Sequence, residues 1–128
     1  NSVGVVNQKM LLENYTTKSS VFNSWEDEAK LEWGNLSEEE GKKYAEDTST
    51  SFHVKNTKAP VLVIQGKNDN IVPHEHAREL INKLKQDGKT YMSMFQAKEG
   101  HCVKCTGELA TLEYFNSQEE FLEKYLEN

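Results

Sequence analysis

The spacing of the apolar residues changes at Pro60. Before Pro60 they are scattered among polar residues, and after it they follow the periods of strands and helices. Residues 61–64 form the unbroken apolar run Val-Leu-Val-Ile, which is typical of a strand buried on both faces of a parallel sheet. Residues 91–95 predict a second strand.

The segment between these strands has the pattern of an amphipathic helix. Apolar side chains recur at positions i, i+3, i+4 and i+7, namely at Ala77, Leu80, Ile81 and Leu84. Pro73 suits the first helical position, and Gly88 suits the left-handed residue that ends a helix. Strand, helix and strand with short connections form a unit whose strands are parallel. We therefore expect an α/β fold.

Further elements are expected on either side of this unit. The β-branched segment Val3 to Val6 is a strand candidate, which would bring the sheet to about three parallel strands with flanking helices. Ser37 and Glu40 form a capping box that predicts a helix to about residue 47. Ser117 and Glu120 form a second capping box, which predicts the start of a carboxy-terminal helix with one apolar stripe: Phe121, Leu122, Tyr125 and Leu126.

Residues 10–35 carry aromatic side chains among many polar residues, which favours short helical turns and loops over one long element. Trp25 and Trp33 are expected to pack in a core or under a lid rather than to form a substrate subsite.

Composition narrows the possible partners. The length of 128 residues fits a single domain over residues 1–128. Lys and Arg number 15 against 21 Asp and Glu, a net charge of −6, which is the wrong sign for a broad surface that binds nucleic acid or anionic membranes. No run approaches the ~20 apolar residues of a membrane span. We expect neither nucleic acid nor membrane as a partner.

Cys102 and Cys105 lie close together in sequence, and a disulfide stabilises more as the loop that it closes lengthens. We therefore expect free thiols and a reducing, cytoplasmic location. A zinc site needs about four ligands, of which this segment offers at most three, and a thioredoxin-like C-x-x-C needs its first cysteine at a helix amino terminus. His74 and His76 point to different faces of a helix, so they are expected at the surface. Neither a metal nor a cofactor is expected.

Two polar residues follow the predicted strands at the points where ligands and catalytic groups gather in open parallel sheets. Asp69 comes after the first strand, and His101 comes after the second. Neighbouring parallel strands end at the same edge, so the two side chains should meet there. A carboxylate beside an imidazole fixes the ring's tautomer and stabilises the imidazolium that forms when the ring takes a proton.

Residues 58–73, with the sequence Lys-Ala-Pro-Val-Leu-Val-Ile-Gln-Gly-Lys-Asn-Asp-Asn-Ile-Val-Pro, and then Glu99-Gly100-His101 resemble the end of an α/β-hydrolase catalytic domain. The closest resemblance is to the prolyl oligopeptidase family of serine peptidases, which includes dipeptidyl and acylaminoacyl peptidases. The carboxy-terminal helix over 117–126 resembles the family pattern too. The resemblance implies that Asp69 and His101 are two members of a Ser-Asp-His triad, and that the chain corresponds to the last three strands of an eight-stranded sheet.

One departure from the family bears on activity. The family's nucleophile lies in a G-x-S-x-G elbow, and no such motif occurs in this sequence. The resemblance therefore implies the carboxy-terminal part of a serine hydrolase, a peptidase acting on a peptide or ester substrate, whose serine lies outside this chain. The isolated chain is expected to be inactive. An esterase or acyl-transfer relative and a non-catalytic α/β module for protein association are the alternatives.

The resemblance also implies that Val3 to Val6 is the sixth strand of the family's sheet. Its usual neighbour would belong to the missing amino-terminal half. An uncovered strand edge is a template for another chain. We therefore expect this edge to pair with that half, to pair with a second copy in a homodimer, or to be covered by residues 10–35.

Overall fold

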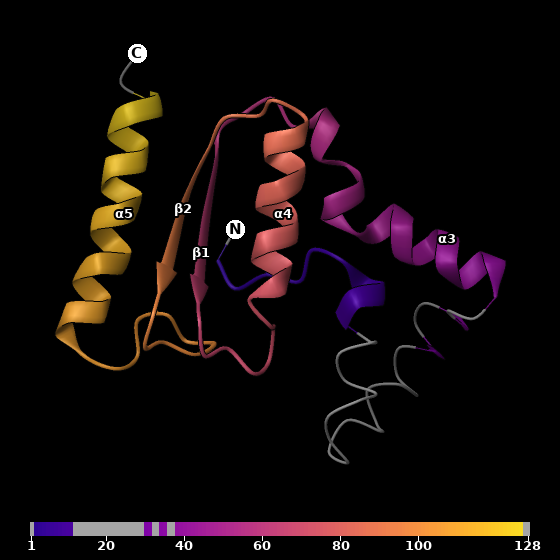
Figure 1. Cartoon of the computed structure of the whole chain (residues 1–128), viewed down its shortest axis with the longest axis horizontal. Helices are drawn as coiled ribbons and strands as arrows, with labels where there is room; N and C mark the ends of the chain where they lie inside the picture. Colours follow the sequence, from indigo (N-terminus) through magenta and orange to yellow (C-terminus); the bar gives the residue numbers. More distant parts are fainter. Residues whose placement is uncertain (1, 12–29, 32–33, 36–37, 127–128) are drawn as a thin grey trace.

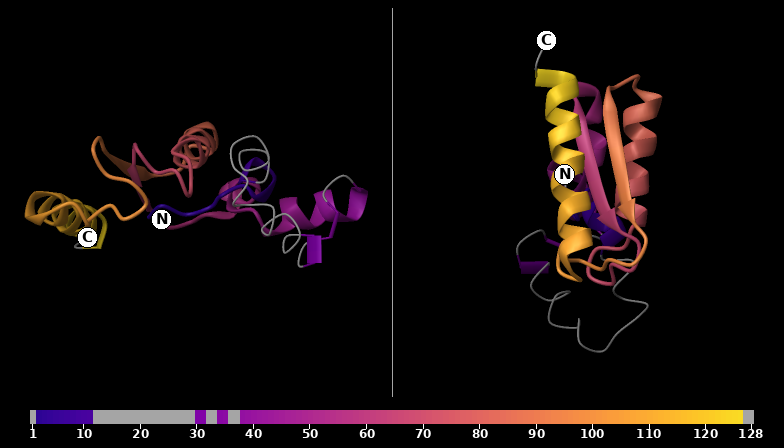
Figure 2. Two further views of the ribbon diagram at one scale, coloured as in Figure 1. Left: turned by 90° about the horizontal axis from the view of Figure 1, so that it is seen from below. Right: turned by 90° about the vertical axis from the view of Figure 1, so that its left-hand side faces the viewer.

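The computed structural model describes residues 2–11, 30–31, 34–35 and 38–126. In chain order the elements are α3 (Glu39–Thr48), the 3-10 turns η2 (Thr50–Phe52) and η3 (Val54–Asn56), β1 (Val61–Gly66), α4 (Glu75–Gln86), β2 (Tyr91–Gln96) and α5 (Glu108–Leu126). The two strands lie between α4 and α5, which cover opposite faces of the sheet (Figure 1). Figure 2 shows the same layering from two further sides. The α/β prediction is confirmed, with two parallel strands rather than about three in the described part of the chain.

The strand-helix-strand unit follows the sequence pattern closely. β1 and β2 pair in parallel, from Val61 opposite Tyr91 to Gly66 opposite Gln96. The apolar stripe of α4 packs against β1 and η3, and the buried cluster comprises Val6, Val54, Val63, Ala77, Leu80 and Leu84. The hydrophobic run after Pro60 is therefore a core strand, as predicted.

The two ends of α4 differ in how well the sequence located them. Pro73 is not the first helical residue, because the helix begins at Glu75 with His74 as its N-cap. Gly88 ends the helix as predicted, with a φ of +61°. The amide of Lys89 donates to the carbonyl of Leu84 at 2.8 Å, which is the bond expected when a left-handed glycine follows a helix.

The strand predicted over Val3 to Val6 is wrong. Only Ser2 forms a parallel bridge, to Ile64 of β1, and the amide of Val3 donates to the carbonyl of Ile64 at 3.0 Å. Val3 has a φ of +44°, which an extended strand does not allow, and this turns the chain away from β1. Val6 is then fully buried in the core with α4 rather than standing at an open edge.

The start predicted for the last helix is also wrong. α5 begins at Glu108, so Ser117 lies inside it and its hydroxyl donates to the carbonyl of Tyr114 at 2.8 Å instead of capping a helix end. The helix predicted to about residue 47 is confirmed as α3, whereas Ser37, Trp25 and Trp33 lie outside the described residues.

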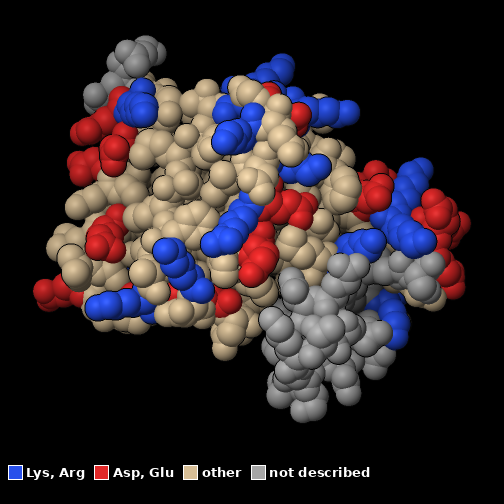
Figure 3. Space-filling view, viewed as in Figure 1, with Lys and Arg blue, Asp and Glu red and all other residues tan. Residues whose placement is uncertain are grey.

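Charges of both signs are interspersed over the face of the molecule in Figure 3. In the described part of the chain, no helix combines the length and apolarity that a membrane crossing needs.

Candidate active site

The loops that follow β1 and β2 lie together at the lower edge of the sheet in Figure 1. Backbone hydrogen bonds join them: the amide of Lys67 donates to the carbonyl of Gln96, and the amide of Asn68 donates to the carbonyl of Glu99, both at 2.9 Å. These bonds extend the pairing of the strands into their loops. The residues that follow are therefore held against each other by the backbone.

Gly66 makes this close approach possible. A Cβ atom at this position would collide with the backbone carbonyl oxygens of Glu99 and Gly100. The loop after β2 thus passes directly over the end of β1, at a separation that only glycine allows.

Asp69 is held in this loop by hydrogen bonds to both of its carboxylate oxygens. Oδ1 accepts from the backbone amides of Ile71 at 2.9 Å and Val72 at 2.8 Å. Oδ2 accepts from the side-chain amide of Gln65 at 3.0 Å. The carboxylate side chain has no exposed surface, so these donors replace the water that it loses on burial.

His101 completes the set of donors. Its Nδ1 atom lies 3.0 Å from Oδ2 of Asp69. An ionised carboxylate only accepts hydrogen bonds, so this pairing favours the tautomer in which Nδ1 carries the proton. The imidazole is 45% exposed while its partner is fully buried. The predicted proximity of the two side chains is confirmed.

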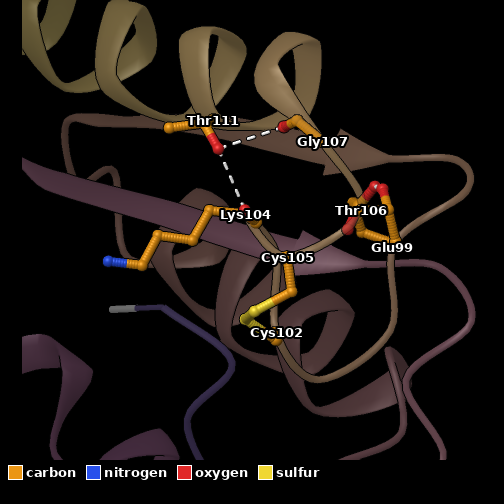
Figure 4. Close-up of a disulfide and its surroundings, with 7 residues drawn as sticks. All are labelled: Glu99, Cys102, Lys104, Cys105, Thr106, Gly107 and Thr111. Atoms are coloured by element: carbon orange, nitrogen blue, oxygen red, sulfur yellow. Dashed lines mark hydrogen bonds between the residues drawn. A yellow bond between two sulfur atoms is a disulfide. The ribbon is translucent and has the colours of Figure 1, made fainter.

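The turn that follows His101 is closed by a disulfide between Cys102 and Cys105, whose Cα atoms are 5.4 Å apart (Figure 4). The expectation of free thiols is wrong, because the turn brings the two side chains together despite the short ring. The basis for expecting a reducing compartment is removed with it. Paired sulfurs also offer no thiolate to zinc.

Other contacts hold the same segment. Val103 is buried, and the hydroxyl of Thr111 lies 3.0 Å from the carbonyl oxygens of Lys104 and Gly107. The hydroxyl of Thr106 donates to the buried carboxylate of Glu99. Figure 4 shows Glu99, Thr106 and Thr111 around the disulfide. The segment is therefore attached to both α5 and the loop that follows β2.

His76 does not lie at the surface as predicted. It is fully buried at the start of α4, where its Nδ1 atom accepts from the amide of Val6 at 3.4 Å. Burial lowers the pKa of His76, against the opposing effect of the carboxylates of Glu79, Glu75 and Asp69. Its ring fixes the amino-terminal segment to α4, a contact that helical spacing within α4 does not reveal. His74 is partly exposed beside Glu75.

Gln65 is the site residue that the sequence pattern did not single out. It is 1% exposed and lies on β1, directly before Gly66. The sequence feature that could have identified Gln65 is its polar side chain at the end of an otherwise apolar strand, four residues before Asp69. Burial of such a group requires hydrogen-bond partners.

A model of the prolyl oligopeptidase family matches residues 3–128 of the sequence. The chain belongs to the prolyl oligopeptidase family. This is a family of serine peptidases, and the assignment confirms the resemblance carried by residues 58–73 and 99–101. A search of curated proteins found no match.

Solved structures of several peptidases share the fold. Acylaminoacyl peptidase from Pyrococcus horikoshii superposes with a TM-score of 0.74 at 23% identity, over 98% of this chain and 19% of that one. Porphyromonas gingivalis dipeptidyl peptidase 4 superposes at 0.64 with 13% identity, over 72% of this chain and 12% of that one. A puromycin-hydrolysing peptidase of Mycobacterium tuberculosis superposes at 0.59 with 23% identity, over 78% and 14%. The chain thus spans about a fifth of the length of the acylaminoacyl peptidase.

Proposed function

We propose that this chain supplies the acid and the base of a Ser-Asp-His triad in a serine peptidase. His101 acts as general base and then as general acid, and Asp69 orients its ring. The nucleophilic serine comes from polypeptide outside this sequence, which contains no G-x-S-x-G elbow. The substrate is a peptide, with an ester or other acyl group as the near alternative.

The hydrogen bond between His101 Nδ1 and Asp69 Oδ2, at 3.0 Å, carries this proposal. It supports the tautomer in which the second ring nitrogen, Nε2, has a lone pair to accept the proton of a serine hydroxyl. The half-exposed ring beside a fully buried carboxylate suits a base that must meet a group from another segment. Family membership independently supports serine peptidase chemistry.

The test joins this sequence to a nucleophile-bearing segment. A longer polypeptide in which a G-x-S-x-G segment of the family precedes these residues should react with a fluorophosphonate probe, whereas the 128-residue chain should not. In the longer polypeptide, His101→Ala should lower turnover by several orders of magnitude, because triad members act as a unit.

The matched control is His53→Ala, which alters an exposed histidine whose ring contacts the carbonyl of Asp47 and which should leave labelling unchanged. Labelling of the 128-residue chain itself would show that the serine has been assigned to the wrong place. Equal turnover with and without His101 would refute its role as the base.

An association role is the second candidate, because α5 carries an apolar stripe on its outer side. Four large side chains of this outer stripe are about half exposed or more: Leu112, Phe115, Leu122 and Leu126. Their spacing places them on one side of the helix. Sedimentation of the chain at micromolar concentration, compared with the Leu122→Glu variant, tests this role. A monomer in both cases contradicts self-association through the stripe.

A further inference from the structure

Gln65 places its side-chain amide between two parts of the Asp69 turn. Its Nε2 atom donates to Oδ2 of Asp69 at 3.0 Å and to the carbonyl of Val72 at 3.1 Å, with the carbonyl of Gly66 further away at 3.3 Å. A primary amide has two N–H hydrogens, so the two shorter bonds account for both of them. The Gln65 side chain therefore links β1 to the beginning of the turn, at Asp69, and to its end, at Val72.

The two oxygens of Asp69 are held in different ways. Oδ1 is bound by backbone amides of its own turn, at Ile71 and Val72, and these bonds move with the turn. Oδ2 receives no such local bond, and its two donors are Gln65 Nε2 and His101 Nδ1. Gln65 is thus the donor from the rigid strand that fixes the oxygen on which His101 depends.

We propose that Gln65 is a positioning residue of the Asp69–His101 pair. It holds the carboxylate in the orientation in which Oδ2 accepts a hydrogen bond from His101 Nδ1–H, and so selects the Nδ1–H tautomer of the ring. This proposal rests on the proposed function for its catalytic meaning, but the positioning itself is a property of the 128-residue chain and is tested there.

In a purely structural role, Gln65 would only donate a hydrogen bond to the buried carbonyl of Val72. Gln96 offers a matched control for such a role. It is also a buried glutamine, 4% exposed, at the end of the neighbouring strand, and its amide donates to the carbonyl of Ala110 on α5 at 3.1 Å. It makes no contact with Asp69 or His101 in the described structure.

The experiment measures the tautomer of His101 by nitrogen-15 NMR of the imidazole rings at neutral pH, with His101→Gln used to assign the signals. The native chain should show Nδ1 protonated, and Asp69→Asn should show the loss of this preference. Gln65→Met removes the amide at similar volume, and its His101 signals should move towards those of Asp69→Asn. Gln96→Met should leave the His101 signals at their native positions, while thermal unfolding shows a loss of stability comparable to that of Gln65→Met.

Native His101 signals in a folded Gln65→Met variant would overturn the proposal, and so would equal changes in Gln65→Met and Gln96→Met. Where Gln65→Met does not fold, Gln65→Asn takes its place, because it keeps a polar amide at the buried position but draws the donor back by one methylene group. Its His101 signals should move part of the way towards those of Asp69→Asn. Native His101 signals in Gln65→Asn would equally refute positioning by the amide. If the longer polypeptide does not react with the probe, the proposed triad is refuted. The His101 signals of the 128-residue chain do not depend on that result, so the two proposals can fail separately.

Discussion

Gly66 and Glu99 lie so close together that the backbone carbonyl of Glu99 occupies the space that a side chain at position 66 would need. One residue belongs to the end of β1, and the other belongs to the loop that leads to His101. The distance between the Asp69 loop and the His101 loop is therefore fixed by contact between two backbone segments. A backbone segment cannot move aside as the end of a flexible side chain would.

Gly66→Ala is expected to destabilise the fold by about 1–3 kcal/mol, the usual range for overpacking a buried position. The added methyl group must push the loop after β2 away from β1 and lengthen the bond from the amide of Asn68 to the carbonyl of Glu99, which is now 2.9 Å. Denaturant unfolding measures the loss. Gly100→Ala is the control, because its added Cβ would meet its nearest neighbour, the carbonyl oxygen of Asn68, at an ordinary 3.6 Å. Equal stability of the two variants would contradict this account of Gly66.

Gly88→Ala should cost about 1–2 kcal/mol, because a left-handed backbone strains any residue that carries a Cβ. Gly88 has a φ of +61° and no neighbouring atom within reach of an added Cβ, so the cost comes from conformation and not from a clash. Gly88→Asn should cost less, since asparagine tolerates this conformation better. Thermal unfolding of the two variants checks the order, and a more stable Gly88→Ala variant would contradict it.

Reduction of the Cys102–Cys105 disulfide is expected to lower the free energy of unfolding by about 2 kcal/mol at most, since a short ring removes little entropy from the unfolded chain. The segment should stay in place, because buried Val103 and the contacts of Thr111 also hold it. Unfolding with and without dithiothreitol measures the difference. A double variant with serine at both cysteine positions should not respond to the reductant, and a response from it would show that the effect arises elsewhere.

The buried ring of His76 should make stability depend on pH. Burial lowers its pKa in the folded state below the unfolded value of about 6.5, so near neutral pH and below the unfolded chain binds the proton more readily. The free energy of unfolding should therefore fall as the pH decreases from about 7.5 to about 5.5, and the contribution is fully present only above the unfolded pKa. The carboxylates of Glu79, Glu75 and Asp69 reduce the size of this effect.

His76→Gln provides the comparison, since it keeps an acceptor for the amide of Val6 but does not titrate. Its stability should fall less than that of the native chain over this pH range. A His76→Gln variant with the same slope as the native protein would assign the pH dependence to other groups.

Periodicity alone determined the unit from β1 through α4 to β2, because a continuous apolar run and a helical apolar stripe are local properties of the chain. It also placed Asp69 and His101 together, since neighbouring parallel strands end at one edge whatever surrounds them. The family motif around these residues pointed to the same pair, and the agreement of the two lines located the candidate site.

The features that the sequence pattern did not predict depend on the folded structure. The positive φ of Val3 and the burial of Val6 against α4 removed the expected strand, and the same packing buried His76, which helical spacing alone placed at the surface. The disulfide depends on the turn of the loop, and the start of α5 lies nine residues before the capping box that was expected to begin it. Gln65 had no motif of its own, and its importance comes from the three-dimensional position of Asp69 Oδ2. Local patterns report which face of an element is apolar, whereas only the folded chain determines which polar groups lose water and must find partners.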